Sequence, residues 1–465
     1  MTVRALPASP YPKADTLRVA IVGRGFSGMM TAIALMKTVT RPFHLRLFDP
    51  QPSVSGGQAL ASVHSTEILN SRVRDLSVST GEPEDFTIWL TANARFRETV
   101  PAAIPGFGQI FVQKGIFSDY VYQRFSEALA MRTDVSIQLS NDVVTSIKRT
   151  ASGTFCLQTE DGDELAYDTV FMATGYGDRD QAKKPADVET GMVSNRRLGG
   201  PRRVVILGSG LRAVDRVFQL RDGGFTGQIT ILSRRGFLPQ PHTRLSADPV
   251  FPPQPMPSQL GGIVRFVRQA CAEAEASGNG WQAAMNGLRK RARLLWSSLS
   301  PREKRQFNRH LRAIYDSHRN RVPADVHARM ERELAGGATD LKRGHVLRRA
   351  YGGLVVRWPG QNDEDLLMAD DVIDCRCLAP DLSKPAIRTL LDTGLARTDE
   401  LDLGLAVNAA GEVFPPKGKQ TGLFAIGPLG LGSLPDIDLV PEIVTQAYAA
   451  AALVEIRYRP QLQAG

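Results

Sequence analysis

A glycine-rich stretch close to the start of the chain has residue types that suit binding of a nucleotide pyrophosphate. Gly23 permits a tight turn, Gly25 lets the backbone approach a phosphate closely, and Gly28 lets the following helix pack near a strand. The amides at the start of that helix would then face the phosphates. Asp49 comes at the end of the next hydrophobic run, where its carboxylate can bind a ribose diol. The pattern therefore predicts a dinucleotide site.

Three elements must position these residues, and the sequence predicts them in the order that a dinucleotide fold requires. Val19 to Val22 is a short buried strand, Met29 to Lys37 a helix, and His44 to Phe48 a second strand. A glycine motif alone is a weak signal, and this β-α-β arrangement strengthens it. The alternative is an ordinary β-α-β unit with a glycine-rich turn. The residues expected to bind the cofactor here are Gly23, Gly25, Phe26, Ser27, Gly28 and Asp49.

The same pattern returns in the middle of the chain. Val204 to Leu207 is a predicted strand, and the turn residues Gly208, Gly210 and Ala213 follow it and lead into a helix. The acid expected after the second strand is missing, and Ser233-Arg234-Arg235 stands in its place. A hydroxyl and two guanidinium groups suit a 2′-phosphate, which favours NADPH over NADH. The alternative is that both arginines only face solvent.

Two further segments complete the first nucleotide fold. Asp168 to Ala173 is a predicted strand that ends in a turn, where a glycine lets the backbone pass close to a cofactor. Near the end of the chain, Thr421 to Ile426 predicts another strand and turn, followed by a helix from Val440 to Arg457. We expect this last turn to lie near the flavin of a bound FAD. The residues expected to bind FAD from these segments are Thr174, Gly175, Gly427 and Pro428.

The length and these repeated patterns predict the domain organisation. A chain of 465 residues is too long for one ordinary core. We predict an α/β protein with two Rossmann-like dinucleotide-binding domains, the second inserted into the first. The FAD-binding domain is expected to comprise residues 1–197 and 381–465, and the NADPH-binding domain residues 198–380.

A helical insertion is predicted within the second domain, at about residues 246–339. Apolar residues recur every three or four positions in 259–277, 281–299 and 301–318, and Ser300 to Glu303 is a capping-box sequence. Part of the excess of basic residues behind the net charge of +9 falls here. No nucleic-acid-binding module accompanies it, so we expect solvated helix faces and no nucleic-acid partner.

Composition narrows the class of protein. With 42% hydrophobic and 23% charged residues and no long apolar run, we expect a soluble protein without membrane spans or a signal peptide. Four cysteines in so long a chain favour a reducing, cytoplasmic setting. Cys375 and Cys377, two residues apart on a predicted strand, are held too far apart for an unstrained disulfide. The sequence shows no metal-ligand cluster, and we assign no catalytic side chain.

These motifs carry a resemblance to a known family. Ala173 to Tyr176 is similar to the ATGY motif of N-hydroxylating and related class B flavin monooxygenases. The stretches LSRRGFLPQPH, VIDC and FAIGPLGLG resemble those of a bacterial group of FAD/NAD(P)-binding proteins with a glutathione-reductase-like fold. The chain also departs from these relatives. Pro428 replaces the Asp common in flavin reductases, Arg376-Cys377 stands where Thr-Gly is usual, and residues 434–438 lack a Trp-Glu pair.

The resemblance implies an FAD-dependent oxidoreductase that consumes NADPH. The preferred interpretation is a monooxygenase that works through a flavin hydroperoxide, with molecular oxygen and a small-molecule substrate such as an amine or amino acid as partners. Because the flavin performs the chemistry, no side-chain nucleophile is required. Two alternatives stay open. One is an NADPH-dependent flavin reductase or dehydrogenase that inserts no oxygen, and the other is a nucleotide-binding scaffold or sensor.

Overall fold

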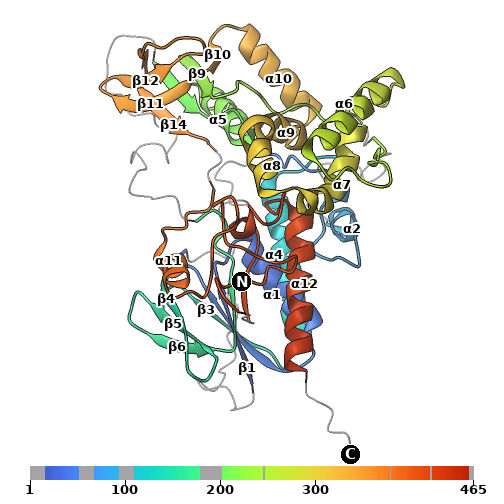
Figure 1. The fold of residues 1–465 in the computed structure, drawn as a ribbon, viewed down its shortest axis with the longest axis vertical. Helices are drawn as coiled ribbons and strands as arrows, with labels where there is room; N and C mark the ends of the chain where they lie inside the picture. Colours follow the sequence, from blue (N-terminus) through green and yellow to red (C-terminus); the bar gives the residue numbers. More distant parts are fainter. Residues whose placement is uncertain are drawn as a thin grey trace, which may run out of the picture. The chain divides into compact units, whose positions relative to one another are not determined.

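The computed structural model shows a mixed α/β chain (Figure 1). It describes residues 16–51, 67–93, 109–177, 202–244, 247–376, 379–418 and 422–459. The chain divides into two compact units, one formed by Met1–Arg179 with Ala379–Gly465 and the other by Asp180–Leu378. The expected domain boundary at residues 197 and 198 lies outside the described residues, and so does Cys377.

The first unit is built on a five-stranded sheet in which every neighbouring pair of strands is parallel. In sheet order the strands are β15 (Leu423–Ala425), β7 (Thr169–Met172), β1 (Leu17–Val22), β2 (Phe43–Phe48) and β3 (Ser136–Ser140). The side chains of β1, β2 and β7 are almost all buried, as expected for parallel strands covered on both faces. The strands predicted around the first glycine motif and near the chain end are confirmed. Their carboxyl ends meet at one edge of the sheet.

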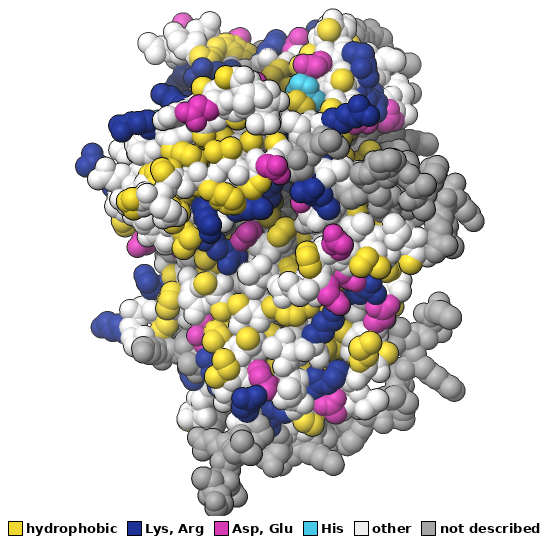
Figure 2. All heavy atoms as spheres, turned by 90° about the vertical axis from the view of Figure 1, so that its right-hand side faces the viewer, with side chains coloured by type: hydrophobic (Ala, Val, Ile, Leu, Met, Phe, Trp, Pro, Cys, Tyr) yellow, Lys and Arg dark blue, Asp and Glu magenta, His cyan; other side chains and the backbone are white. Residues whose placement is uncertain are grey.

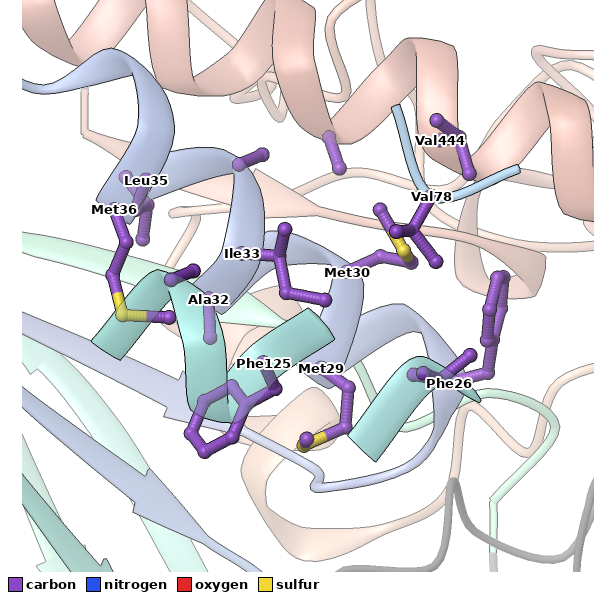
Figure 3. Packing of buried hydrophobic residues seen from close by; sticks show 14 of the residues in the cluster. Phe26, Met29, Met30, Ala32, Ile33, Leu35, Met36, Val78, Phe125 and Val444 are labelled. Carbon is purple, nitrogen blue, oxygen red and sulfur yellow. The ribbon is translucent and has the colours of Figure 1, made fainter. Parts of the chain in front are cut away.

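Helices cover one face of this sheet: α1 (Phe26–Thr38), α4 (Lys114–Ala130) and α12 (Val440–Tyr458). Helix α1 is buried along nearly its whole length because it packs against both α4 and α12. In Figure 3, Met29 of α1 lies beside Phe125 of α4, and Met30 lies beside Val78 and Val444. Each such side chain contributes about 1.5–3 kcal/mol when fully buried, so the helix that follows the first glycine turn is firmly held.

The other face is covered by a smaller antiparallel sheet and a helix. The sheet consists of β4 (Val144–Arg149), β5 (Phe155–Thr159) and β6 (Glu164–Tyr167), and the helix is α11 (Pro385–Asp392). Helix α2 (Asp85–Ala92) and the short 3-10 turn η1 (Val73–Asp75) lie in the connection between β2 and α4. The sequence did not predict α11.

The second unit repeats this plan on a four-stranded parallel sheet. In sheet order its strands are β10 (Thr339–Arg343), β9 (Gln228–Ser233), β8 (Arg203–Leu207) and β14 (Asp371–Asp374). Helix α5 (Leu211–Asp222) follows β8, as α1 follows β1. A three-stranded antiparallel sheet again precedes the last strand, formed by β11 (His345–Ala350), β12 (Gly353–Arg357) and β13 (Asp365–Met368). The predicted fold class, with two Rossmann-like domains, is confirmed.

The predicted insertion in the second unit is helical. Its helices are α6 (Leu260–Ala276), α7 (Gln282–Ser298), α8 (Pro301–Gln306), α9 (Arg312–Arg319) and α10 (Ala324–Ala335). The capping box is confirmed, since Ser300 Oγ accepts from Glu303 N and Glu303 Oε2 accepts from Ser300 N at 3.0 Å. On the face that Figure 2 presents, basic side chains are scattered among hydrophobic and acidic ones and form no single stripe.

One predicted helix of the insertion, at 301–318, is interrupted by a π-helical segment, Phe307–Leu311. Arg312 N donates to Phe307 O, which is the wider i to i+5 pattern. The extra residue in this turn lets the Phe307 ring contact both Trp296 and Tyr315, with ring centroids 5.6 Å away in each case. Apolar periodicity predicts a continuous helix here because it does not register a single inserted residue.

Candidate functional site

The first glycine turn leaves no room for side chains at two of its positions. Gly23 has a φ of +106°, and a Cβ there would lie 2.4 Å from the carbonyl oxygen of Ala173, the residue that follows β7. A Cβ at Gly28 would lie 2.0 Å from Gly23 O. Since real Cβ atoms do not approach a carbonyl oxygen so closely, both positions require glycine. The turn therefore lies close against the carboxyl ends of the central strands.

The amino end of α1 is a buried helix terminus without a side-chain cap. Its N-cap is Gly25, and Phe26 and Ser27 of the first turn are 7% and 6% exposed. The first amides of a helix have no acceptors within the helix, and the helix dipole makes this end partly positive. Such an end is suited to an anionic group such as a pyrophosphate.

Asp49 is held in a fixed orientation at the end of β2. Its Oδ2 accepts a hydrogen bond from Arg24 N at 2.8 Å, and its Oδ1 accepts one from Gln51 N at 2.9 Å. The residue is half-buried. Each carboxylate oxygen retains a second lone pair, so the group can still accept hydrogen bonds from a ribose diol.

Arg24 is a residue of this site that sequence reasoning missed. It is 1% exposed, and its Nη2 donates to Asn141 Oδ1 at 3.0 Å and contacts the carbonyl oxygens of Asp49 and Gln51. Burial lowers the pKa of its guanidinium, and the neighbouring carboxylate of Asp49 opposes that shift. The side chain therefore ties the ends of β2 and β3 to the glycine turn. The sequence feature that could have identified Arg24 is its position between Gly23 and Gly25 of the motif.

The end of β7 places two of the predicted residues beside this turn. Ala173 N donates to Val22 O at 2.8 Å, and Thr174 N lies 3.1 Å from where a Cβ of Gly23 would be. Thr174 Oγ1 is buried and forms no hydrogen bond with any residue that the structure describes. Gly175 follows with a φ of +61°. A buried hydroxyl without a protein partner is available to a bound ligand.

The last predicted segment reaches the same place from the far end of the chain. Gly427 has a φ of +80°, and a Cβ there would lie 2.3 Å from Ser27 Oγ of α1. Gly427 N donates to Oε1 of the fully buried Gln446 on α12 at 2.8 Å. Pro428 has no N–H and begins a short 3-10 turn. Neither residue therefore has an amide free for a ligand, and the turn contributes shape. Gln446 carried no signal in the sequence.

The second glycine turn repeats two features of the first, a glycine with positive φ and a glycine at the helix N-cap. Gly208 has a φ of +94°, and a Cβ there would lie 3.0 Å from the backbone of Cys375. Gly210 is the N-cap of α5, and Ala213 is fully buried in its first turn. Cys375, which follows the last residue of β14, is buried.

Hydroxyl groups take the place of the acid at the end of β9. Ser233 Oγ lies 2.8 Å from Ser209 Oγ and accepts a hydrogen bond from Gly236 N at 3.0 Å. Arg234 and Arg235 follow on the surface. Arg235 Nη2 donates to Arg309 O at 3.0 Å, in the π-helical segment of the insertion. The insertion thus contacts the loop that carries the two arginines.

The described ranges contain neither a metal-ligand cluster nor a helix that could span a membrane. His, Cys, Asp and Glu side chains there form no group that could hold a metal ion. Every helix in those ranges is too short or too polar to cross a lipid bilayer.

Comparison with known proteins finds a match to the first part of the chain. Residues 20–177 match a family model described as FAD-NAD(P)-binding. This segment is an FAD/NAD(P)-binding domain. It contains the first glycine turn, Asp49 and the end of β7. A search of curated protein sequences finds no match.

Solved structures with the same fold extend over nearly the whole chain. An ornithine hydroxylase from Pseudomonas aeruginosa is 16% identical with a TM-score of 0.58, covering 95% of this chain and 100% of that one. An L-lysine 6-monooxygenase from Pseudomonas syringae is 13% identical with a TM-score of 0.58, covering 95% and 98%. A bacillithiol disulfide reductase from Bacillus cereus is 14% identical with a TM-score of 0.51, covering 95% and 99%. At these identities the likeness establishes the fold alone, with its two dinucleotide-binding domains.

Proposed function

We propose that the protein is an FAD-dependent oxidoreductase that consumes NADPH. The observation that carries this proposal is the contrast between its two glycine turns. Both turns have a glycine with positive φ after the strand and a glycine at the N-cap of the helix, yet the second strand ends in Asp49 in the first unit and in Ser233, Arg234 and Arg235 in the second. A carboxylate suits a free ribose diol, whereas a hydroxyl and guanidinium groups suit a 2′-phosphate.

The first unit has features that fit FAD. The buried, uncapped start of α1 suits the pyrophosphate, and the oriented carboxylate of Asp49 suits the adenosine ribose. Thr174 Oγ1 is a buried hydroxyl without a protein partner among the described residues, at the same edge of the sheet. Gly427 lies close to Ser27, and because it is a glycine no side chain projects from this position into the same edge. We assign Gly25, Phe26, Gly28, Gly175 and Pro428 to the same site.

The second unit has features that fit NADPH. Gly208, Gly210 and Ala213 form the turn for the pyrophosphate, and Ser233 with Arg234 and Arg235 would hold the 2′-phosphate. The chemistry that bound FAD supplies is transfer of two electrons from NADPH to an acceptor. The role of the chain is to bind and orient the two nucleotides, and no side-chain nucleophile is assigned.

We further propose that the acceptor is oxygen and that the protein is a monooxygenase of a small molecule such as an amine or amino acid. The ATGY resemblance supports this, as does the fold shared with an ornithine hydroxylase and an L-lysine 6-monooxygenase. The likeness to a bacillithiol disulfide reductase keeps a reductase as the second candidate. The sequence has no Cys-x-x-Cys pair of the kind that disulfide exchange uses, which favours the oxygenase.

The deciding experiment measures NADPH oxidation with and without oxygen across a panel of small amines and amino acids. For a monooxygenase, a cognate substrate should lower the peroxide released per NADPH, and labelled oxygen should appear in the product. NADPH oxidation that persists without oxygen in the presence of another acceptor, with no label in any product, would assign the reductase function. A protein that binds both nucleotides and oxidises no NADPH under either condition would be the scaffold or sensor.

A separate experiment addresses the choice of coenzyme. Replacing Arg234 and Arg235 with alanine should raise the KM for NADPH far more than that for NADH, because only NADPH presents a phosphate to them. Each charge-assisted contact is worth about 1.5–3 kcal/mol, roughly a tenfold to hundredfold effect. Replacement of both residues with lysine retains the charge and should raise the KM for NADPH less than replacement with alanine. Equal changes for both coenzymes would contradict the assignment.

A further inference from the structure

The two sheets allow their strand ends to be compared position by position. Gly23 N donates to Phe48 O on β2, and Gly208 N donates to Leu232 O on β9, so Phe48 and Leu232 hold equivalent places. Phe48 pairs with Ser140 of β3, and Leu232 pairs with Lys342 of β10. The next residues on the outer strands are Asn141 and Arg343, which are therefore equivalent.

In the first unit this position belongs to the nucleotide site. Asn141 Oδ1 accepts a hydrogen bond from Arg24, the side chain that also holds the backbone of the Asp49 turn. Its equivalent in the second unit carries a positive charge. Arg343 pairs in register with Ser233, and Gly344 N donates to Ser233 O at 3.0 Å.

The surroundings of Arg343 place it next to the loop that carries Arg234 and Arg235. Residues paired in register project to the same face of a sheet, so Arg343 shares a face with Ser233. The Cβ of Arg343 lies 3.5 Å from where a Cβ of Gly236 would be. Its side chain is exposed, and its guanidinium forms no hydrogen bond or ion pair with any residue of the described ranges.

We propose that Arg343 is a specificity-determining residue that binds the 2′-phosphate of NADPH together with Arg234. This rests on the coenzyme preference proposed above. Arg235 already donates to Arg309 O, so part of its donor set is used within the protein. Arg343 retains its whole guanidinium fork, whose geometry matches a phosphate in bidentate contact. Arg343 lies on β10, the strand next to β9, whereas Arg234 follows Ser233 at the end of β9 itself.

Binding of two adenosine ligands to the FAD-loaded protein tests the proposal without turnover. Adenosine 2′,5′-bisphosphate carries the 2′-phosphate, and adenosine 5′-monophosphate lacks it. Titration calorimetry on Arg343→Ala should show the bisphosphate bound about tenfold more weakly or worse, with the monophosphate unchanged. Arg343→Lys keeps the charge without the fork and should lie between the parent and Arg343→Ala.

Lys342→Ala is the matched control. Lys342 precedes Arg343 on the same strand and is also exposed. It pairs with Leu232, so its side chain lies on the opposite face of the sheet from that of Arg343. Its Nζ lies 3.9 Å from Asp340 Oδ2. The Lys342→Ala substitution also removes one positive charge from this strand. If only the total charge mattered, bisphosphate binding would be weakened equally in Lys342→Ala and Arg343→Ala. Thermal unfolding of each variant checks that the fold is retained.

The outcomes separate this inference from the coenzyme proposal. If the parent binds both adenosine ligands equally well, the NADPH preference itself is wrong. If the parent prefers the bisphosphate and Arg234→Ala loses that preference while Arg343→Ala keeps it, only the role of Arg343 is overturned. Equal losses in Arg343→Ala and Lys342→Ala would also overturn it.

Discussion

The two nucleotide folds of this chain share a backbone and differ in the side chains at the strand ends. The first strand of each fold, β1 or β8, is held near its beginning by the same kind of hydrogen bond. Arg18 N donates to Asp168 Oδ2 and Arg203 N donates to Asp370 Oδ2, both at 2.8 Å. The polar contacts beyond the turn are different. A carboxylate receives the turn amide in the first unit, and two hydroxyl groups meet in the second. From this comparison we expect the shared fold to bind a dinucleotide and the strand-end side chains to determine which dinucleotide it is.

The two folds also differ in how they are completed. The first sheet has a fifth strand, β15, which comes from the far end of the chain and has no counterpart in the described part of the second sheet. The turn after β15 contributes Gly427, which touches Ser27 and is held by Gln446. The first site is therefore assembled from both ends of the chain, whereas the second is contained within one continuous segment.

The largest expected effect concerns the packing of the two glycine turns. Gly28→Ala should lower the free energy of unfolding by about 1–3 kcal/mol or more and abolish the flavin absorbance, because its Cβ would lie 2.0 Å from Gly23 O. Gly210→Ala is the control, since a Cβ there meets no atom within 4 Å. Thermal unfolding and the absorption spectrum measure both effects. A yellow, equally stable Gly28→Ala variant would mean that the turn is not as tight as the structure shows.

The next largest effect is expected from substitutions of the polar groups at the strand ends. Asp49→Asn removes the charge that suits a ribose diol and should weaken FAD binding roughly tenfold to hundredfold. Ser233→Asp places a carboxylate where a 2′-phosphate would lie and should shift the preference from NADPH towards NADH by repulsion. Fluorescence titration with FAD and KM values for both coenzymes measure these changes. The comparison fails if Ser233→Asp weakens NADPH and NADH to the same extent.

The smallest effect concerns Thr174, whose buried hydroxyl has no protein partner in the described ranges. Thr174→Val keeps the shape and removes the hydroxyl, so it should not lower the stability of the FAD-free protein. It should weaken FAD binding by about 0.5–1.5 kcal/mol if the hydroxyl contacts the cofactor. The equivalent position in the second unit is Arg376, which is ion-paired with Asp374 at 2.6 Å. Unchanged FAD affinity in Thr174→Val would remove this residue from the site.

Much of the fold could be predicted because its determinants are local. The glycines at 23 and 28 require a conformation or a close approach that other residues resist, and the runs that become β1, β8 and α1 are apolar enough to be buried. The capping box at Ser300 is likewise encoded within four residues. These signals determined the order of elements, the two glycine turns and the contrast between Asp49 and Ser233.

Other features depend on segments that are distant in the sequence, and only the tertiary structure decided them. Strand β10 has the polar sequence TDLKR, so its periodicity carries no strand signal, and it forms because β9 offers a parallel edge. Arg343 gains its place beside Ser233 through that pairing alone. Likewise, the contact of Ser27 with Gly427, the hydrogen bond of Gln446 and the burial of Arg24 arise from packing between remote elements. Local sequence specifies which backbone turns can form, and long-range packing decides which side chains meet at them.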